Sequence, residues 1–443
     1  MKRRLAKKMF VVVCVTSLLT GVFSECGVKA NEEVAQSDMP EKHMVVLACR
    51  SPEAVACTSL EAIADKYAEE VNPNFSLEIQ TVSEMKEYKQ KIKTLIASGE
   101  DPDMFSMDAD PYARTLLSTG ILKDITEFCK ENNLADKYYD APFQWGAFSD
   151  GVQIGLPVET DIEMFWYNKE LFEKAGVEVP TTMDEFMDTC EKLKEAEITP
   201  ISISGKEPWT VIRYLTRYAF RLEGNDFCNG MVRGERSWKE DTGVKAATFV
   251  QKLGNYFQEG FASYDITAAE DYFLSGNAAI YYIGTWDLDY FQEDNLNENM
   301  KGKVDYFTLP VIEGGATTAN EYIAHGGTPW AFGAKNWDET TEDFILYYIE
   351  HYGEYCAEGG LFSPIKGYDA PNDTELTKKV ENDINSEVGA VRLMDVDTDP
   401  ATNEVLNKEV VSLATGDITV EDFCDRMDEA IQENASEYYD GTW

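Results

Sequence analysis

The sequence predicts an α/β fold in which helices cover largely parallel sheets. Strand-like and helix-like segments alternate along the first part of the chain. The segments typical of strands are 44–48, 76–82 and 103–107, and those typical of helices are 60–71 and 83–98. In the second helix, Tyr88 and Ile92 recur at helical spacing, and Gly99 suits a left-handed helix end. Such alternation favours helices packed on a sheet.

Residues 153–186 repeat the alternation with sharper boundaries. Two β-favouring runs precede a helical pattern, at 153–157, 162–167 and 169–175. Gly176 ends that helix where a positive φ is wanted, and Thr182 with Glu185 forms a capping box that begins the next helix. The α/β prediction therefore extends into the middle of the chain.

Size and charge limit what the protein can be. The chain has 443 residues, of which 44% are hydrophobic and 12% aromatic, enough for two lobes of ordinary size. The net charge is −42, although the first thirty residues are basic. Nucleic acid and anionic membrane surfaces require a basic face, so this composition argues against both as partners. An anionic ligand is disfavoured but not excluded.

The N-terminus has the pattern of an export signal. Basic residues at 2–8 precede an apolar run at 9–23, which is too short for a stable membrane span. Cys26 could be lipidated as in a lipobox, although Glu25 fits that motif poorly; cleavage after Ala30 is the alternative. Either ending predicts export, with residues 31–43 as a polar tether and no later membrane span.

Cysteine and histidine usage argues against a disulfide framework and against a metal centre. Nine cysteines and three histidines are scattered, and no C-x-x-C motif occurs. We interpret the cysteines mainly as buried small hydrophobes, with one disulfide left open. The acidic run 395–399 begins like a calcium loop, but Pro400 and Leu406 stand where Gly and Glu are required, so it is interpreted as a solvated acidic loop.

Five segments in order resemble bacterial extracytoplasmic solute-binding proteins of the sugar-binding type, similar to maltose-binding protein. The most specific is YNKELFEKAGVEVPTTMDEF at 167–186. The others are YKQKIKTLIASGEDPDMFSMD, YFLSGNAAIYYIGTWDLDYF, GGTPWAFGAKNWDETTEDFILYYI and ATGDITVEDFCDRMDEAI, at 88–108, 272–291, 326–349 and 414–431. The resemblance covers roughly 400 residues.

The resemblance implies a two-lobed periplasmic-binding fold of type II, with a hinge and a ligand cleft between the lobes. Lobe one would comprise 44–156 and 308–362, and lobe two 157–307 and 363–443. It further implies a monomeric, non-enzymatic receptor without cofactor or metal. The receptor would capture a mono- or oligosaccharide by hinge closure and deliver it to the permease of an ABC importer, anchored outside the membrane if Cys26 is lipidated.

Residues suited to sugar binding follow the predicted strands. Aromatic faces stack on sugar rings, while carboxylate, amide and guanidinium groups bond to hydroxyls. Trp286 and Asp287 follow the run 279–283, and Glu159 follows 153–157 at a hinge crossing. The further candidates share such loop positions and are Trp209, Asp108, Asp110, Trp330, His325 and Arg50. Core packing or a solvated loop remains the alternative for each, and core packing is favoured for Trp166.

Motifs of common enzyme classes are absent from the sequence: no G-x-S-x-G, H-E-x-x-H, Walker A or G-x-G-x-x-G occurs. Together with the resemblance, this favours a carbohydrate receptor over an enzyme. The alternatives are a binding protein for a polyamine or peptide, an exported glycan hydrolase, and a surface receptor that signals through a partner.

Overall fold

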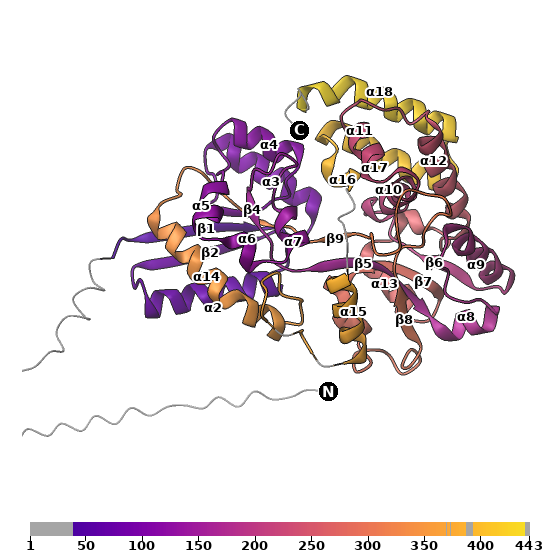
Figure 1. The fold of residues 1–443 in the computed structure, drawn as a ribbon, viewed down its shortest axis with the longest axis horizontal. Coiled ribbons are helices and arrows are strands. Elements are labelled where there is room, and N and C mark those ends of the chain that lie inside the picture. The colour runs from indigo at the N-terminus through magenta and orange to yellow at the C-terminus, as the bar shows by residue number, and fades with distance from the viewer. Residues whose placement is uncertain (1–38, 369, 373, 387–392, 439–443) are drawn as a thin grey trace, which may run out of the picture.

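The computed structural model describes residues 39–368, 370–372, 374–386 and 393–438, which form two lobes, each built on its own sheet (Figure 1). The predicted leader, Cys26 and residues 31–38 of the tether lie outside these residues. The described part of the tether is held at its end, because the side-chain amides of Asn72 and Asn74 donate to the carbonyls of Pro40 and Met39 at 3.0 and 2.7 Å.

The first lobe contains a five-stranded sheet in the order β2-β1-β3-β10-β4. Its strands are β1 (Lys42–Ala48), β2 (Phe75–Thr81), β3 (Met104–Ser106), β4 (Gly155–Leu156) and β10 (Trp330–Phe332). β1 runs parallel to β2 and β3, with Val46 opposite both Ile79 and Met104. β10 is antiparallel to β3 and β4. The prediction of a largely parallel sheet is therefore confirmed for β1, β2 and β3, whereas β10 runs antiparallel to its neighbours.

Helices cover both faces of this sheet. They are α2 (Val55–Glu70), α3 (Met85–Ser98), α4 (Pro111–Ser118), α5 (Thr126–Glu131), α6 (Leu134–Lys137), α7 (Asp140–Trp145) and α14 (Glu339–Glu358). On one face, Tyr67 of α2 packs edge-on against Phe344 of α14 at a ring distance of 5.4 Å. On the other, Tyr88 and Ile92 of α3 are buried with Phe105. As predicted, α3 ends at Gly99 with φ 76°.

The second lobe is built around β5, and its sheet has the order β6-β7-β5-β8, with β9 also paired to β5. The strands are β5 (Asp161–Asn168), β6 (Thr199–Ser202), β7 (Ala278–Gly284), β8 (Val304–Phe307) and β9 (Ala324–His325). β5 is antiparallel to β7, β8 and β9, whereas β6 and β7 are parallel. The prediction of a largely parallel sheet is therefore wrong for this lobe, since β5 enters from the other lobe and runs against its neighbours.

The second lobe holds the remaining helices. They are α8 (Lys169–Ala175), α9 (Met183–Glu195), α10 (Trp209–Glu223), α11 (Asn225–Val232), α12 (Asp241–Leu253), η1 (Gly254–Tyr256), η2 (Phe261–Ser263), α13 (Ile266–Leu274), η3 (Thr285–Phe291), α15 (Glu375–Ser386), α16 (Met394–Asp397), α17 (Pro400–Thr415) and α18 (Val420–Tyr438). The predicted bounds of α8 are confirmed, as is the capping box of Thr182 and Glu185 on α9. Trp166 lies in the core, as predicted, with its ring centroid 4.0 Å from that of Phe291.

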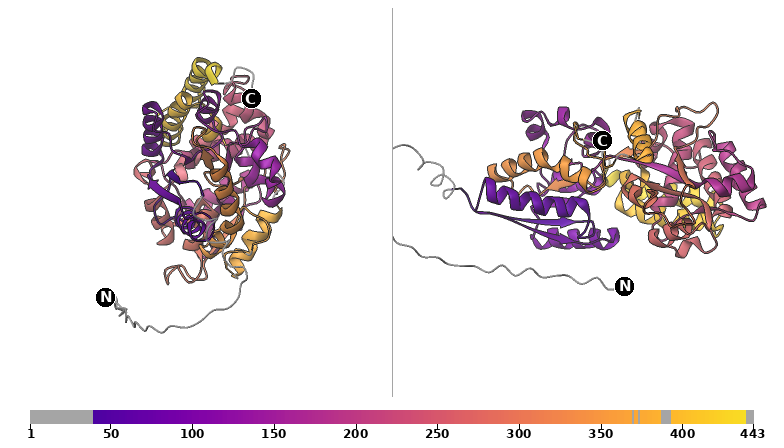
Figure 2. Two further views of the ribbon diagram at one scale, coloured as in Figure 1. Left: turned by 90° about the vertical axis from the view of Figure 1, so that its left-hand side faces the viewer. Right: turned by 90° about the horizontal axis from the view of Figure 1, so that it is seen from below.

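The chain passes between the lobes at 157–160, at 326–329 and after α14, so the lobes lie side by side (Figure 2). Residues 309–324 differ from the predicted division: Leu309, Tyr322 and Ile323 pack in the second lobe's core although that segment was assigned to lobe one. No helix among the described residues is long and apolar enough to cross a membrane. The seven cysteines of the described chain are free, and six are buried, as the composition predicted.

Candidate functional site

Four side chains form a row that joins the two lobes, hereafter the aromatic row: Trp145, His325, Trp286 and Trp209. Trp145 ends α7 in the first lobe, and its ring centroid lies 5.4 Å from that of His325 at the end of β9. His325 lies 5.5 Å from Trp286 of η3, which lies 6.2 Å from Trp209 at the start of α10. The row therefore brings together residues that are up to 180 positions apart.

Two local features hold the row in place. The indole of Trp286 folds back over Gly284, where any side chain would overlap the ring. The backbone amide of Gly327 donates to Nδ1 of His325 at 3.1 Å, so the histidine carries its proton on Nε2, which faces Glu163 Oε1 at 3.5 Å. Trp286 is thus held against the backbone at Gly284, and His325 is held by the Gly327 amide and the Glu163 carboxylate.

A buried charge network lies beneath Trp209 and comprises Arg213, Arg217, Glu163 and Asp395. The guanidinium of Arg213 lies 5.2 Å from the Trp209 ring centre, and its Nε donates to Glu163 Oε1 at 3.1 Å. Arg217 donates to Glu163 Oε2 at 2.7 Å, while Arg213 also pairs with Asp395. Although burial alone would raise the pKa of Glu163, Arg213, His325 and Arg217 bring it down to about 2. The network is charged and internally neutralised.

The first lobe presents two aspartates that follow β3. Asp108 accepts a hydrogen bond from Trp145 Nε1 at 3.3 Å, and burial, with the charge of Asp110, raises its pKa to about 6. Asp110 caps α4, since its Oδ1 accepts from the backbone amide of Ala113 at 2.7 Å. Asp108 therefore meets the aromatic row, whereas the carboxylate of Asp110 serves a helix end.

Glu159 and Arg50 form an ion pair at the hinge crossing. Arg50 Nη1 lies 3.6 Å from Glu159 Oε1, and Nη2 donates to the carbonyl of Thr328 at 2.7 Å. Gly327 has φ 64°, and a Cβ there would overlap the Glu159 carboxylate, so glycine is required on both grounds. Arg50 thus ties the segment after β1 to two of the segments that cross between the lobes, at Glu159 and Thr328.

Asp287 lies next to Trp286 on η3 and has an acidic neighbour, Glu270 of α13. Burial raises the pKa of Asp287 to about 7, with a further contribution from the charge of Glu159. Burial, then the charges of Asp287 and Asp271, raises the pKa of Glu270 to about 8. These two carboxyls, hereafter the acid pair, are held where charge is disfavoured.

The remaining predicted residues take other places. Trp330 is fully buried in the first lobe's core, with the Arg50 guanidinium 5.9 Å from its ring, so its indole faces core side chains. Trp209 begins α10, where a loop was expected. The run 395–399 is not a solvated loop: Asp397 and Asp399 are buried, and Asp399 caps α17. Asp399 thus serves a helix end, and Asp395 pairs with Arg213.

The residues predicted from the sequence did not include Trp145, Arg213, Glu163, Glu270 or Asp395. One signal was present: Trp209, Arg213, Arg217 and Arg221 recur every four residues along α10, which places them on one helix face. Such a stripe normally indicates a solvent-facing side, but here all three arginines are buried against carboxylates or carbonyls.

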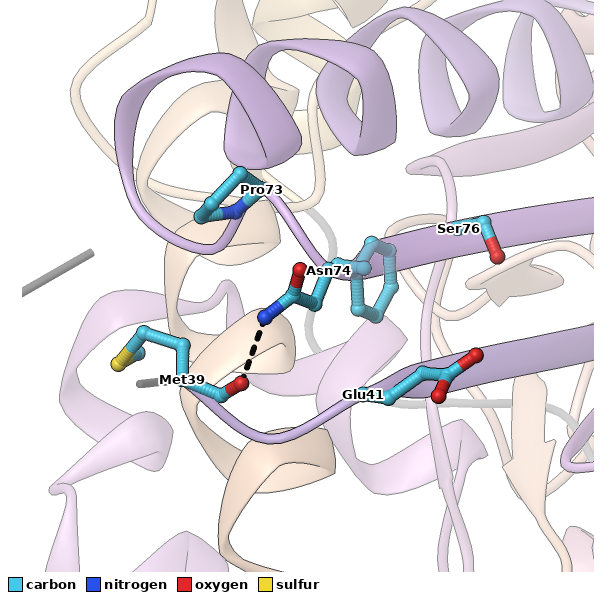
Figure 3. A pocket seen from close by; sticks show the side chains of 6 residues that line it. Met39, Glu41, Pro73, Asn74 and Ser76 are labelled. Carbon is cyan, nitrogen blue, oxygen red and sulfur yellow. Dashed lines mark hydrogen bonds between the residues drawn. The ribbon is translucent and has the colours of Figure 1, made fainter. Parts of the chain in front are cut away.

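A hollow of about 440 Å³ lies elsewhere, at the edge of the first lobe, lined by Met39, Glu41, Pro73, Asn74, Phe75 and Ser76 (Figure 3). Asn74 uses its amide there to hold the Met39 carbonyl. This hollow surrounds the point at which the tether enters β1. It contains no member of the aromatic row.

The geometry can be set beside known proteins. Residues 56–351 match the family described as bacterial extracellular solute-binding protein. The chain belongs to this family. It is 25% identical over 201 residues, 44% of this chain, to a probable sugar-binding periplasmic protein of Mesorhizobium japonicum, and 26% identical over 129 residues to a multiple sugar-binding protein of Streptococcus mutans, 28% of each chain. The matches span about half the length of the first of these relatives, 47%.

Solved structures agree on the fold. A chitin oligosaccharide binding protein superimposes with a TM-score of 0.78 at 22% identity, covering 89% of this chain and 99% of the other. A protein studied for xylan utilization by the thermophilic bacterium Caldanaerobius polysaccharolyticus gives 0.75 at 23% identity, covering 88% and 99%. The family's two-lobed fold, predicted from the sequence, is confirmed.

Proposed function

We propose that this solute-binding protein is a carbohydrate receptor that captures a mono- or oligosaccharide outside the cytoplasmic membrane and delivers it to an ABC importer. The observation that carries the proposal is the aromatic row, in which Trp145, Trp286 and Trp209 come from both lobes. Indole faces beside carboxylates are what pyranose rings and their hydroxyls require. The sugar-binding relatives support the same ligand class.

Hinge closure supplies the mechanism. Sugar binds first to Trp286 and Trp209, which the buried charge network holds in place on the second lobe. Trp145 and Asp108 then reach it from the first lobe, so the ligand favours the closed arrangement through contacts that only closure makes. Binding without bond cleavage is the whole activity, and the permease recognises the closed form.

Anchoring and assembly complete the proposal. Lipidated Cys26 would hold the receptor at the membrane through residues 31–43, with cleavage after Ala30 as the alternative, and the receptor would act as a monomer. Mass spectrometry of the N-terminus distinguishes the two endings. A diacylglyceryl cysteine supports the anchor, whereas an N-terminus at Asn31 overturns it.

A thermal-shift screen against mono- and oligosaccharides, polyamines and peptides tests the ligand class. A ligand at about 100 times its Kd adds ~2.7 kcal/mol to the free energy of unfolding, enough for a clear rise in Tm. A shift with one sugar class supports the proposal. A shift with spermidine or a peptide alone would overturn the sugar and favour the second candidate, a receptor for a polyamine or another non-sugar solute, which the acid pair makes plausible. Release of reducing ends would identify a hydrolase.

A further inference from the structure

Asp161 begins β5 where the chain enters the second lobe, and one of its two carboxyl oxygens lacks a partner among the described residues. The residue is 2% exposed, and its Oδ1 accepts a hydrogen bond from the Thr285 hydroxyl at 2.8 Å. Its Oδ2 makes no hydrogen bond to any residue that the structure describes. Buried polar atoms are normally paired, so this oxygen requires a physical explanation.

The paired side of Asp161 holds the segment that carries Trp286. Thr285 precedes Trp286 on η3, and its hydroxyl donates to Asp161 while it accepts from the backbone amide of Ile162 at 3.2 Å. The hydroxyl is thus held from both sides by the start of β5. Through Thr285, the carboxyl of Asp161 therefore fixes the backbone from which the Trp286 indole projects.

The unpaired oxygen of Asp161 faces His325, a central ring of the aromatic row. The two residues lie opposite each other in the pairing of β5 with β9, where the lobes meet (Figure 1). His325 Nδ1 lies 3.9 Å from Asp161 Oδ2, too far for a hydrogen bond, and accepts instead from the Gly327 amide at 3.1 Å. A proton between these two atoms, carried by either one, would close the gap and satisfy the carboxyl oxygen in place of the bond from Gly327.

Other acids close to Asp161 and His325 already have cationic partners. Glu163 pairs with Arg213 and Arg217, and Glu159 pairs with Arg50. No arginine or lysine of the described chain forms an ion pair with Asp161, and His325 supplies the basic nitrogen nearest to it. The charged and titratable groups around the two residues are Glu163 on β5, Glu159 at the first crossing, Arg50 after β1, Arg213 on α10, Asp108 after β3 and Cys356 on α14.

The electrostatics of Asp161 and His325 favour retention of a proton between them. Burial, followed by the charge of Glu159, raises the pKa of Asp161 well above its ordinary value. Burial lowers the pKa of His325, but Glu163, at 3.5 Å, and the charge of Asp161 outweigh it and raise this pKa above 6.5. The two groups titrate as a unit, and their last proton leaves at a pH above the ordinary range of histidine.

We propose that Asp161 is a positioning residue of the carbohydrate site, which fixes Trp286 through Thr285 and fixes His325 through a proton shared with its second oxygen. The inference rests on the proposed carbohydrate function and makes that binding dependent on pH. When the two residues lose their proton, the buried carboxylate must draw water into the junction between the lobes, and closure over a sugar would expel that water. Sugar affinity should therefore fall as the pH rises above neutrality, and binding there should take up protons.

Isothermal titration calorimetry of the purified protein from about pH 6 to about pH 9 tests the inference. The probes are maltotriose, cellotriose, xylotriose and chitotriose. For a trisaccharide that binds, we expect the affinity to fall at least about fivefold across this range, with proton uptake at its upper end. In the ligand-free protein, tryptophan fluorescence should change over the same range, because the shared proton alters the electric field at Trp145 and Trp286.

Three variants separate positioning from general damage to the fold. Asp161→Asn keeps an oxygen that accepts from Thr285 but cannot ionise, so its affinity should vary by about twofold or less across the pH range, and its fluorescence transition should disappear. Asp161→Ala also removes the acceptor for Thr285 and should bind at least about tenfold more weakly than Asp161→Asn near pH 6. Asp289→Asn changes an exposed aspartate of η3 and should reproduce the wild-type affinity and pH profile. Thermal unfolding of the variants establishes that they fold.

The outcomes separate this inference from the function on which it rests. The pKa values of Asp108 and Asp287 also lie near neutrality, at about 6 and about 7, so the comparison with Asp161→Asn identifies the responsible group. A profile for Asp161→Asn as steep as that of the wild type, or a flat wild-type profile, overturns the inference and leaves the carbohydrate receptor intact. If no saccharide binds but the fluorescence transition is present in the wild type and absent from Asp161→Asn, the carbohydrate function fails and the shared proton is supported. Absence of both binding and transition overturns both.

Discussion

Two groups of acids in the second lobe differ in how their charge is balanced. Beneath Trp209, Glu163 is held between Arg213 and Arg217, and Asp395 pairs with Arg213. Beyond Trp286, the charge of Asp287 raises the cost of ionising Glu270, and no ion pair to either is found among the described residues. The first group holds a fixed negative charge, with the pKa of Glu163 lowered to about 2, while the second resists ionisation.

The difference separates acids whose charge is balanced inside the fold from acids whose charge is not. A neutralised network fixes its members, so the buried charge network acts as a rigid support for Trp209. An acid pair without a cation destabilises its own charged form, so it gains most from a positive or hydrogen-bonding ligand. A binding site requires side chains that are held rigidly, as Trp209 is by the charge network, and polar groups whose hydrogen-bonding capacity is not yet used.

Removing Glu163 tests the support and should have the largest effect. Glu163→Gln leaves two arginines buried beside a neutral group, and loss of one partner of a buried ion pair typically costs about 3–5 kcal/mol. Urea denaturation should show this loss of stability. Glu298→Gln, at the exposed pair with Lys301, is the control and should leave the midpoint unchanged. A wild-type midpoint for Glu163→Gln would show that the network does not stabilise the fold.

Trp286 is a central ring of the aromatic row, so its removal tests whether the row binds carbohydrate. Trp286→Ala deletes the central indole of the aromatic row and should weaken carbohydrate binding at least about tenfold, or ~1.4 kcal/mol. Calorimetry with the sugar identified by the thermal-shift screen measures the change. Trp337→Phe alters a tryptophan of the first lobe's core face and should leave the affinity at the wild-type value. Unchanged affinity in Trp286→Ala would remove Trp286 from the site.

The pH dependence of stability should have opposite signs in the two groups. The folded pKa of Glu270 is raised from 4.5 to about 8, so the folded state holds a proton that the unfolded chain releases, and stability falls as pH rises between these values. For Glu163, lowered to about 2, stability is instead lost as pH falls below 4.5. Glu270→Gln should therefore stabilise the ligand-free protein at pH 8 by about 1 kcal/mol or more, and have little effect at pH 4.

Thermal unfolding of wild type and Glu270→Gln across pH 4–8 tests whether the variant's stability advantage grows as the pH rises. A difference in Tm that widens with pH supports the uncompensated acid pair. A constant difference would mean that Glu270 has an ordinary carboxyl in the folded protein. Asp271→Asn provides the exposed comparison on the same helix.

Local sequence signals predicted much of the fold but only part of the site. The bounds of α8, the capping box of α9 and the left-handed end at Gly99 depend on neighbouring residues, so they could be read directly. Trp286 and Asp287 were predicted as ligand contacts because they follow a strand, and the structure confirms that position directly after β7.

Long-range pairing could not be predicted in the same way. The antiparallel course of β5 depends on the route of the chain between the lobes, not on its composition. The pairing of Arg213 with Asp395 joins residues 182 positions apart. Trp330 follows a glycine-rich turn as binding tryptophans do, yet β10 turns its indole into the core. Each miss concerns tertiary packing, which no spacing in the chain encodes.

Asp110 represents a third kind of acid, one satisfied by backbone, and its removal should have the smallest effect. Asp110→Ala removes the cap of α4 and should lower stability by about 1 kcal/mol, whereas Asp110→Asn keeps a good cap and should be nearly neutral. Urea denaturation and sugar titration of both variants separate the two roles. If affinity falls in both while stability falls only in Asp110→Ala, the carboxylate contacts ligand as the sequence predicted. If affinity is unchanged in both, Asp110 acts on the helix alone, and Asp108 is the aspartate through which the first lobe meets the aromatic row.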